Sequence, residues 1–585
     1  MCGLILQLNC NESSIVSSGQ KIFSKVQDEL QIRGPDKQSY LAKRNLFLGH
    51  GRLSILDVDN GSQPMEKDGK VVVFNGEIYN FKYLKSTFSE DKYSTDCDSE
   101  ILLSIPDINN PQQFLNSLRG MFAICLVDFE KERILAARDR FGKKPLFAAN
   151  IDGKLFLSSR MKTISKLLDG RGKISPEGLG YFSDFGFIPA PFSIMEGVEK
   201  FLPGEWRLYN FKGEVVKKGS IDPIRMPHDL DPNDPNLEVS SFKNSIISAT
   251  QRRLQSDRPL GILLSDGIDS SIIAHTIQSQ LNSEKHIKAY ILSSNDHLDE
   301  SPGAIKFAKS IGIDYEVISM EATEDIYSEV LSVLDEPFAD LSIFPTYSAF
   351  KALKKHATVA ITGDGGDELF GGYPHQFSNR FILNASKFAK HYGPLRRLKL
   401  LKDLPHAFSK PSYLYRRISS SGLFHTKYYQ ELRHQIPNYN ERYLLLKESR
   451  AVQSFEGDLE KSQWSNSISF GLLDRMLTKV DVCSMGAGVE ARSPFLDEDL
   501  WNRCMVHPAT RKDFENKTCK SFLKNYAAPF KINPRKSGFS MDYERFQPKQ
   551  GAESSSMFGK NIFSGEGSSP LTYRILDDWI NENLL

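Results

Sequence analysis

The hydrophobic pattern divides the chain into two parts with different rhythms. From residue 1 to about 220, short apolar runs predict strands separated by turns, as in LFLGHGRLSILDV, VVVFNGEIYN, AICLVDF and ILAARD. Their alternation and β-branched content are typical of stacked antiparallel sheets. After residue 238, the runs LGILL, IKAYILSS, YEVIS and TVAIT are each followed by polar or helical-period sequence. This second rhythm predicts parallel strands joined by crossover helices.

Segments of biased composition separate the predicted domains. Residues 219–238 are rich in proline and aspartate and predict a linker, because they cannot continue a helix or a central strand. Residues 549–570 predict a flexible loop by their glycine and serine content. Between about 375 and 480 the pattern is mostly helical and loop-like. The predicted divisions are 1–218, the linker, 239–545, and a flexible segment with a C-terminal helix at 546–585.

Composition excludes several classes of protein. The 585 residues are too many for one hydrophobic core. A net charge of +1 gives no indication of nucleic acid or an acidic membrane, and no apolar run approaches the ~20 residues that span a bilayer. The N-terminus lacks the features of a secretory signal, and the seven cysteines form no CxxC pair. We therefore expect a cytoplasmic protein without zinc or disulfides.

A cysteine directly follows the initiator methionine. Removal of Met1 would give Cys2 a free α-amine, whose reference pKa of ~7.7–8.0 lies close to the ~8.5 of a thiol. Such an amine can serve as the general base for its own thiol, without a histidine. From its position alone, a coincidental cysteine is the favoured interpretation of Cys2, so the motifs downstream must decide between the two.

Those motifs resemble the class II glutamine amidotransferase domain. They are HGRLSILDVDNGSQPM, FNGEIYNF, TDCDSE and RDRFGKKPLF, together with RGPD at 33–36 and GFIPAP at 186–191. The resemblance covers most of residues 1–205 and implies an αββα sandwich of the N-terminal-nucleophile type. It also implies that the Cys2 thiolate attacks the amide carbon of glutamine.

The resemblance assigns the glutamine-site residues one by one. Asn75 would supply its side-chain amide and Gly76 its backbone N–H to the oxyanion of the tetrahedral intermediate. Arg52 would bind the α-carboxylate of glutamine, a suitable role for a guanidinium group. Glu77 and Asp98 would hold the α-ammonium group.

A second constellation begins at LGILLSDGIDSSIIAHTI, residues 260–277, which predicts a strand, a tight loop and a helix. It resembles the pyrophosphate loop of adenylating synthetases and is not a Walker A loop. Loop N–H groups and a helix N-terminus would face phosphate. The expected ATP-binding residues are Leu263, Ser265, Gly267, Asp269, Ser270, Leu292, Thr362 and Gly363. Ordinary core packing explains the two leucines almost equally well.

Further motifs follow in the order of the asparagine synthetase family. They are DEPFADLSIFPTY, TVAITGDGGDELFGGY, KTCKSFLKNY and RKSGF. By the resemblance, Asp364 acts where the acyl-adenylate forms, and Asp269 and Asp367 lie on the side of magnesium and pyrophosphate. Lys520 would stabilise charge on the leaving pyrophosphate. KVDVCSMGAGVEARSPFLDEDL resembles a helical segment of the family, in which Glu490 and Arg492 favour an internal ion pair over a substrate contact.

Two positions depart from the family patterns. Arg160 stands where glutamate is frequent, which suggests a structural or interdomain role. Asp266 replaces the usual second glycine of the pyrophosphate loop. A carboxylate facing phosphate would be repelled by about 1 kcal/mol or more. Asp266 could instead point outward or join a magnesium shell, and a third interpretation is a loop that binds ATP poorly.

The sequence thus predicts an α/β and α+β protein: an Ntn-hydrolase sandwich followed by an α/β pyrophosphate-loop domain with helical additions. The resemblance implies a glutamine-dependent asparagine synthetase that uses ATP and Mg²⁺ and passes ammonia through an internal tunnel. Dimers occur in the family, so the resemblance is compatible with a homodimer. Aspartate is the leading acceptor. The alternatives are another carboxylate such as a sugar acid or an amino-acid-derived metabolite, a β-lactam synthetase-like ligase that needs no ammonia, and a glutaminase or binding protein with an impaired synthetase half.

Overall fold

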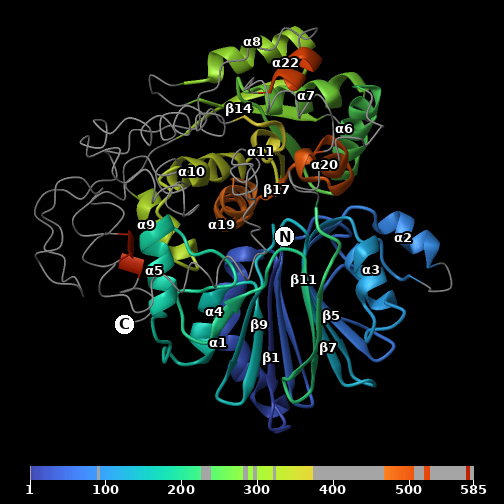
Figure 1. Ribbon diagram of the computed structural model, residues 1–585, viewed down its shortest axis with the longest axis vertical. Coiled ribbons are helices and arrows are strands. Elements are labelled where there is room, and N and C mark those ends of the chain that lie inside the picture. The colour runs from blue at the N-terminus through green and yellow to red at the C-terminus, as the bar shows by residue number, and fades with distance from the viewer. Residues whose placement is uncertain are drawn as a thin grey trace, which may run out of the picture.

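The computed structural model contains two domains, with a β-sandwich below and an α/β domain above it in Figure 1. The structure describes residues 2–88, 93–224, 239–280, 287–293, 299–320, 325–372, 467–505, 520–527, 575–576 and 578–579. The expected stretches at 375–466, 535–539 and 549–570 lie outside these residues.

Two antiparallel sheets form the sandwich, and each has six strands. The first has the order β10-β8-β9-β1-β3-β2. Its strands are β1 (Gly3–Asn9), β2 (Lys37–Lys43), β3 (Leu46–Arg52), β8 (Phe147–Ile151), β9 (Lys154–Ser158) and β10 (Val198–Lys200). The second has the order β12-β11-β7-β6-β5-β4. Its strands are β4 (Met65–Lys67), β5 (Lys70–Ile78), β6 (Gly120–Asp128), β7 (Arg133–Arg138), β11 (Glu205–Asn210) and β12 (Val215–Ser220).

Both faces of each central strand are buried, which explains their continuous apolar sequences. In β1, Leu4 and Leu6 face the other sheet, where they meet Val71 and Val73 of β5. Ile5 points the opposite way, into a cluster of residues from the covering helices. Alternate residues of one strand therefore enter two different cores.

Helices cover the two outer faces and complete an αββα arrangement. The face of the first sheet carries α1 (Gly19–Arg33), α4 (Met161–Leu167) and α5 (Pro176–Phe185). The second sheet is covered by α2 (Phe81–Thr87), η2 (Ser99–Ser104) and α3 (Gln112–Ser117). A short helix, η1 (Val16–Ser18), precedes α1.

The second domain is built on a parallel sheet of five strands in the order β15-β14-β13-β16-β17. These are β13 (Leu260–Leu263), β14 (Lys288–Ser293), β15 (Tyr315–Ser319), β16 (Val359–Ile361) and β17 (Glu490–Arg492). One face packs against α6 (Val239–Arg253), α7 (Ile268–Gln280), α8 (Ser301–Ile311) and α20 (Glu498–Met505). The other packs against α9 (Asp325–Val333), α10 (Ile343–Leu353) and α19 (Leu477–Gly486). Shorter elements are α11 (Gly366–Phe370), α22 (Ser521–Ala527), η7 (Pro494–Leu496) and the π-helical η6 (Ser467–Met476).

Two sequence-based boundaries need correction. The predicted linker begins at 219, but Gly219 and Ser220 still pair with β11 because β12 runs to Ser220. The segment expected to be helical at Glu490 and Arg492 is strand β17, since it pairs in parallel with β16. The first correction comes from a hairpin with the neighbouring strand β11, and the second from pairing with the distant strand β16, which local sequence does not reveal.

The two domains share a hydrophobic core and buried ion pairs. One apolar cluster includes Leu30 and Met161 of the first domain and Phe350 and Cys483 of the second. Asp481 of α19 lies 2.8 Å from Arg33 Nη1 and 2.8 Å from Lys144 Nζ. The domains are therefore held as one unit.

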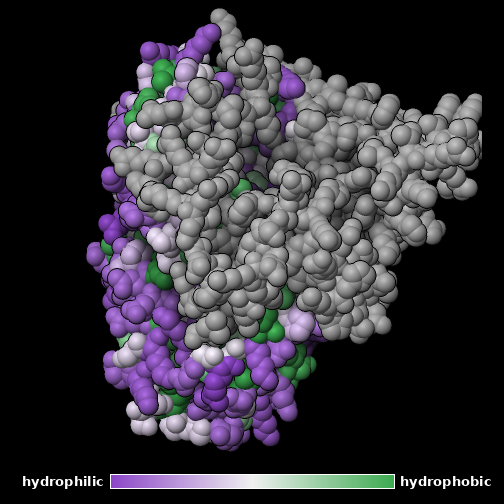
Figure 2. Space-filling model, turned by 90° about the vertical axis from the view of Figure 1, so that its left-hand side faces the viewer, coloured by the Kyte–Doolittle hydropathy of each residue, from purple (hydrophilic) through white to green (hydrophobic). Residues whose placement is uncertain are grey.

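The described surface is mainly polar. Figure 2 shows hydrophilic residues over most of the sandwich half on that face, with hydrophobic residues scattered among them. Among the described residues, no helix is long and apolar enough to cross a membrane. The six cysteines in this part of the chain are free thiols.

Candidate active sites

Cys2 lies where the two sheets of the sandwich meet at one end. Gly3 pairs with Gly51, so that Cys2 and Arg52 stand at the same end of the first sheet. The second sheet brings Asn75 to this point on β5, and Asn75 Oδ1 accepts a hydrogen bond of 3.2 Å from the Cys2 backbone N–H. Asn75 Nδ2 donates to Ser159 Oγ at 3.3 Å. The structure thus places the expected oxyanion amide beside the expected nucleophile.

Gly76 occupies a position that no larger residue fits. Its φ of 153° lies in the region that favours glycine, and a Cβ atom there would lie 2.0 Å from Met121 O. The absence of a side chain therefore lets β5 approach β6 closely, directly beside Asn75.

Arg52 is buried at the end of β3 and holds the loop that follows. Its guanidinium group donates to the carbonyl oxygens of Leu56, Asp57 and Val58 at 3.0, 2.7 and 2.8 Å. A guanidinium group has five N–H donors, so part of its capacity remains for a ligand.

Glu77 and Asp98 form a buried acidic pair next to the thiol. Asp98 Oδ2 accepts the N–H of Ile78 at 2.8 Å, and Glu77 Oε2 lies 3.1 Å from Arg492 Nη2. In the described part of the chain, Glu77 Oε1 is buried without a hydrogen bond. Burial raises the pKa of Glu77 well above its usual range, although Arg492 opposes the shift, and burial raises the pKa of Asp98 to about 6. Another cation in this space would stabilise both carboxylates.

The Cys2 thiol itself is buried. Burial raises its pKa, while the positive charge of the chain's amino terminus and the N–H of Leu53 oppose the rise. A thiol in such a place needs a nearby base to become a thiolate. The position of the α-nitrogen beside Asn75 allows the amine of a processed chain to fill that role.

The second constellation lies at the carboxyl ends of the parallel strands. The loop after β13 is closed by Ser265 and Ser270, whose hydroxyl oxygens are 3.1 Å apart, and Gly267 N–H donates to Ser265 Oγ at 3.2 Å. Helix α7 begins directly after this loop. Open parallel sheets bind ligands at this edge. Leu263 and Leu292 are partly buried at the carboxyl ends of β13 and β14, in contact with the shared core.

The carboxylate of Asp266 is held against the first turn of α8. A Cβ atom on Gly303 would lie 2.3 Å from Asp266 Cγ and 2.4 and 2.5 Å from its two carboxylate oxygens. The space that a side chain at 303 would need is therefore filled by Asp266. The positive end of a helix dipole is a favourable place for a carboxylate.

Asp269, Asp367 and Lys520 form a compact ionic group beside the loop. Lys520 Nζ donates to Asp269 Oδ2 and lies 2.6 Å from Asp367 Oδ1. Burial would lower the pKa of Lys520, but the two carboxylates raise it overall. Glycines make room, since a Cβ atom on Gly366 would lie 2.6 Å from Asp269 Oδ1 and one on Gly372 only 1.9 Å from Asp367 Oδ1.

Thr362 and Asp364 follow β16 next to this group. Thr362 Oγ1 donates to Asp364 Oδ2 at 2.7 Å, and Ser493 Oγ donates to the carbonyl oxygen of Asp364 at 2.5 Å. Gly363 lies against Asp269, where its Cβ atom would be 3.0 Å from that of Asp269. All the residues expected for the nucleotide site are thus on the same edge of the sheet.

Comparison with protein families identifies both halves. A glutamine amidotransferase domain model matches residues 1–218, and an asparagine synthase model matches residues 241–549. The chain belongs to the asparagine synthase family. It combines a glutamine amidotransferase domain with an ATP-using synthetase domain, which are called the glutaminase and synthetase domains below.

Several curated asparagine synthetases align with most of this chain. Asparagine synthetase [glutamine-hydrolyzing] 1 of Bacillus subtilis strain 168 is 28% identical over 564 residues, which cover 92% of this chain and 87% of the relative. Asparagine synthetase [glutamine-hydrolyzing] 3 of the same strain is 25% identical, covering 86% and 81%. The Asparagus officinalis asparagine synthetase is 27% identical, covering 68% and 64%.

Arg492 of the synthetase domain connects the two sites of this family member. Its side chain pairs with Glu77 of the glutaminase domain and with Glu490, whose Oε1 lies 2.5 Å from Arg492 Nε. Its carbonyl oxygen accepts the N–H of Thr362 at 2.8 Å. The internal ion pair expected for Glu490 and Arg492 is confirmed, and it extends across the domain boundary.

Sequence reasoning missed several residues around the glutaminase site. Ser159 contacts Asn75 and comes from the segment SSRMK, where only the departure at Arg160 was noted. Arg33 donates from Nε to the carbonyl oxygen of Cys2 at 3.2 Å, and it begins the RGPD motif. Arg160 lies 3.1 Å from Glu29 and 3.3 Å from Asp335 of the synthetase domain, which gives it the interdomain role that the sequence suggested.

Proposed function

We propose that this chain is a glutamine-dependent asparagine synthetase. The synthetase domain adenylates aspartate with ATP and releases pyrophosphate, and the glutaminase domain supplies ammonia that displaces AMP. The observation that carries the proposal is that one residue, Arg492, contacts both Glu77 of the thiol site and Thr362 of the nucleotide site. Two sites joined in this way are suited to producing and consuming one intermediate.

In the glutaminase site, the α-amine of Cys2 takes the thiol proton, and the thiolate attacks the amide carbon of glutamine. Asn75 Nδ2 turns from Ser159 to the developing oxyanion, which the N–H of Gly76 also stabilises. The α-ammonium of glutamine binds to the carboxylates of Glu77 and Asp98. The remaining N–H donors of Arg52 bind the α-carboxylate of glutamine. Collapse of the tetrahedral intermediate breaks the C–N bond and gives the thioester, and the nitrogen leaves as ammonia with the proton that the α-amine had taken. Water then hydrolyses the thioester, and glutamate leaves.

In the synthetase site, the loop with Ser265, Gly267 and Ser270 binds the phosphates of ATP, and Leu263 and Leu292 hold the adenosine. Thr362 and Gly363 contact the nucleotide, and Asp364 lies where the acyl-adenylate forms. Lys520 stabilises negative charge on the departing pyrophosphate.

Asp269 and Asp367 fit a magnesium ion. Both present a carboxylate oxygen to Lys520 Nζ. Mg²⁺ in nucleotide sites is usually held by one or two carboxylates together with phosphates and water. No group of three or more His, Cys, Asp or Glu side chains that could hold a metal ion occurs among the described residues. When bound, magnesium would neutralise phosphate charge during adenylation.

An apolar cluster between the two sites offers a route for ammonia. Leu53 and Met121 lie beside Cys2 and Gly76, and they pack in one cluster with Val359 of β16 and Met485 of α19. Apolar walls exclude water and favour neutral ammonia over ammonium. We assign the internal passage to this cluster.

Product analysis tests the proposal. Purified protein with glutamine, Mg–ATP and aspartate is expected to form asparagine, glutamate, AMP and pyrophosphate in equal amounts. Omission of aspartate should stop AMP and pyrophosphate formation. Glutamate without AMP in the presence of aspartate would reject aspartate as acceptor, and a panel of sugar acids and amino-acid-derived acids would then separate another acceptor from an inactive synthetase half.

The contact between Asp266 and Gly303 makes a separate prediction about ATP. We expect Gly303→Ala to displace the Asp266 carboxylate toward the loop and to raise KM for ATP by about 5-fold or more, as like-charge repulsion of about 1 kcal/mol requires. Asp266→Gly should remove this sensitivity. In that background Gly303→Ala should be neutral or stabilising, because alanine favours a helix.

Steady-state KM values for ATP in the four proteins of this mutant cycle provide the measurement. If Gly303→Ala raises KM for ATP by the same factor in the wild-type and Asp266→Gly proteins, the substitution acts through the backbone of α8 rather than through Asp266.

A further inference from the structure

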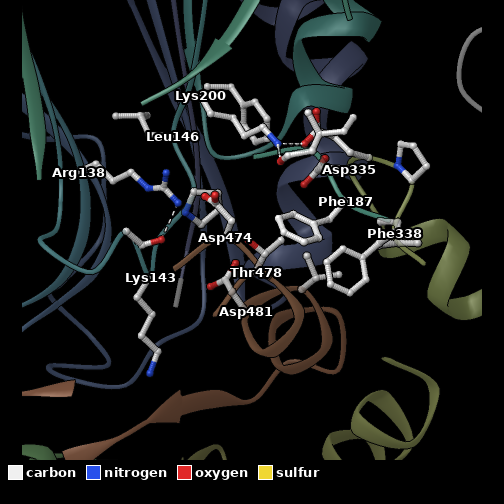
Figure 3. Close-up of a pocket in the computed structure, with 18 residues that line it drawn as sticks. Arg138, Lys143, Leu146, Phe187, Lys200, Asp335, Phe338, Asp474, Thr478 and Asp481 are labelled. Carbon is white, nitrogen blue, oxygen red and sulfur yellow. Dashed lines mark hydrogen bonds and ion pairs between the residues drawn. The ribbon is translucent and has the colours of Figure 1, made fainter. Parts of the chain in front are cut away.

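His50 is a fully buried histidine that belongs to neither set of expected site residues. Its ring nitrogen Nδ1 has no hydrogen-bond partner among the described residues. By contrast, Lys200 at the cavity between the two domains is paired with Glu336 (Figure 3). Burial of a polar group without a partner is costly, so the place of this imidazole needs an explanation.

His50 joins the two sheets of the sandwich beside Cys2. It lies on β3 opposite Leu4 of β1, the strand that Cys2 precedes. Its Nε2 donates to the carbonyl oxygen of Phe74 on β5, in the other sheet, at 3.1 Å. Because a carbonyl oxygen only accepts, Nε2 carries a proton. This hydrogen bond therefore runs from the sheet of the nucleophile to the strand that carries Asn75.

Gln63 holds the other backbone group of the same residue. Its Oε1 accepts the N–H of Phe74 at 2.7 Å. Strand β4 pairs with β5 only as far as Met65, opposite Val72, so Phe74 lies beyond the end of β4. The side chains of Gln63 and His50 thus satisfy both backbone groups of Phe74 where that strand partner has ended. Both side chains come from the motif HGRLSILDVDNGSQPM.

The residue held in this way directly precedes the two expected oxyanion donors. Asn75 Oδ1 accepts the N–H of Cys2 at 3.2 Å, and Gly76 follows Asn75 on the same strand. A shift of β5 at Phe74 would therefore move both donors relative to the thiol. Misplacement by about 1 Å in an active site can lower the rate by about 10²-fold.

The imidazole of His50 is neutral. Burial lowers its pKa to about 3, and Arg52 and the amino terminus lower the pKa as well, while the hydrogen bond to Phe74 opposes the shift. The ring therefore does not titrate in the range in which a thiol and an α-amine exchange protons. It remains a hydrogen-bond donor throughout that range.

We propose that His50 and Gln63 are positioning residues of the glutaminase site. They hold β5 at Phe74, so that the oxyanion donors on the next two residues are in place before glutamine binds. Preorganised donors need no reorganisation in the transition state. The inference rests on the proposed hydrolysis of glutamine and deepens it, because it names the residues that fix the oxyanion donors without touching the substrate.

His50→Met removes the donor and keeps a side chain of similar size. We expect kcat for glutamine hydrolysis to fall by about 10- to 100-fold. KM for glutamine should change little, because the groups assigned to its α-carboxylate and α-ammonium remain. Synthesis from added ammonium chloride should keep the wild-type rate. The measurement is glutamate formed over a range of glutamine concentrations.

Two further variants test the same contacts. Gln63→Met should lower kcat in the same way, because it removes the acceptor for the Phe74 N–H. His50→Gln should restore much of the wild-type kcat, since its side-chain amide can donate to the Phe74 carbonyl oxygen. If His50→Met fails to fold, Gln63→Met decides the question.

The pH profile and a matched control separate positioning from other roles. The pH dependence of kcat should be the same in His50→Met and the wild-type protein, because the ring stays neutral. The control is Asn45→Leu: Asn45 is also buried, and its Nδ2 donates to the carbonyl oxygen of Asn9 at 2.9 Å, at the end of β1 opposite to Cys2. This variant should lower the melting temperature and leave kcat unchanged.

The possible failures are distinguishable. A wild-type kcat in His50→Met and Gln63→Met, or an equal loss of kcat in Asn45→Leu, would reject positioning and leave the proposed function intact. An altered pH profile, with His50→Gln as inactive as His50→Met, would make His50 an acid–base group instead. If the wild-type protein forms no glutamate from glutamine in the presence of Mg–ATP and aspartate, the proposed function fails and the inference fails with it.

Discussion

Cys2→Ala should abolish glutamine-dependent amide synthesis and leave ammonia-dependent synthesis near the wild-type rate. The substitution removes the atom that attacks the glutamine amide, next to Asn75. We expect a loss of about 10³-fold or more in glutamine hydrolysis, as found when an enzyme loses its covalent nucleophile. The measurement is asparagine formed from glutamine and, separately, from ammonium chloride.

Cys10→Ala is the matched control for this experiment. Cys10 follows β1 at the end of the sheet opposite to Cys2, where it lies near Leu8 and Gly213. Both activities of this variant should equal those of the wild-type protein. Glutamine-driven synthesis that survives in Cys2→Ala would show that the glutaminase assignment is wrong, whereas loss of both activities would point to a folding defect.

Local pattern was enough to predict both sheets. The central sandwich strands are buried on two faces and the parallel strands are covered by helices on both sides, so many of them appear in the sequence as short apolar runs. The hydrophobic pattern did not predict helix α1. This helix packs Val26 and Leu30 against the sheet, but it also buries Glu29 and Arg33, which form ion pairs, so its buried face is not uniformly apolar. Its role in the interface depends on partners far away in the sequence.

For the candidate sites, the sequence predicted only those residues that belong to recognisable motifs. The ordered motifs predicted the residues of each site. Their glycines are informative because Gly76 lies too close to the backbone of β6, and Gly366 too close to the Asp269 side chain, for a larger residue to fit. The motifs did not indicate that Glu77 pairs with Arg492, more than 400 positions away. Such contacts depend on how the two domains dock.

Asp266 illustrates the same limit at a single residue. The sequence left three interpretations open for its carboxylate. The structure places it against Gly303, a residue that carries no recognisable motif. Asp266 and Gly303 fit by shape: the carboxylate of Asp266 occupies the space that a side chain at position 303 would need. Such a fit depends on the three-dimensional structure and has no signature in the sequence.

Lys520→Met is expected to lower pyrophosphate formation by about 10²- to 10³-fold, as loss of one preorganised electrostatic donor does in other enzymes. Lys520 contacts both Asp269 and Asp367, and its backbone has a φ of 53°, uncommon for a residue other than glycine. The surrounding structure therefore fixes the ammonium group next to the pair that we assign to magnesium. The measurement is the single-turnover rate of pyrophosphate release with ATP and aspartate at saturating magnesium.

Three comparisons make that result specific. Lys520→Arg should retain part of the rate, because the charge is kept while the geometry changes. Lys351→Met, which removes an exposed lysine from α10, should have the wild-type rate. Glutamine hydrolysis in Lys520→Met should persist, since Lys520 belongs to the synthetase domain and the glutaminase domain has an apolar cluster of its own. A wild-type rate of pyrophosphate release in Lys520→Met would remove Lys520 from the mechanism and leave magnesium and the loop N–H groups as the stabilisers of the leaving group.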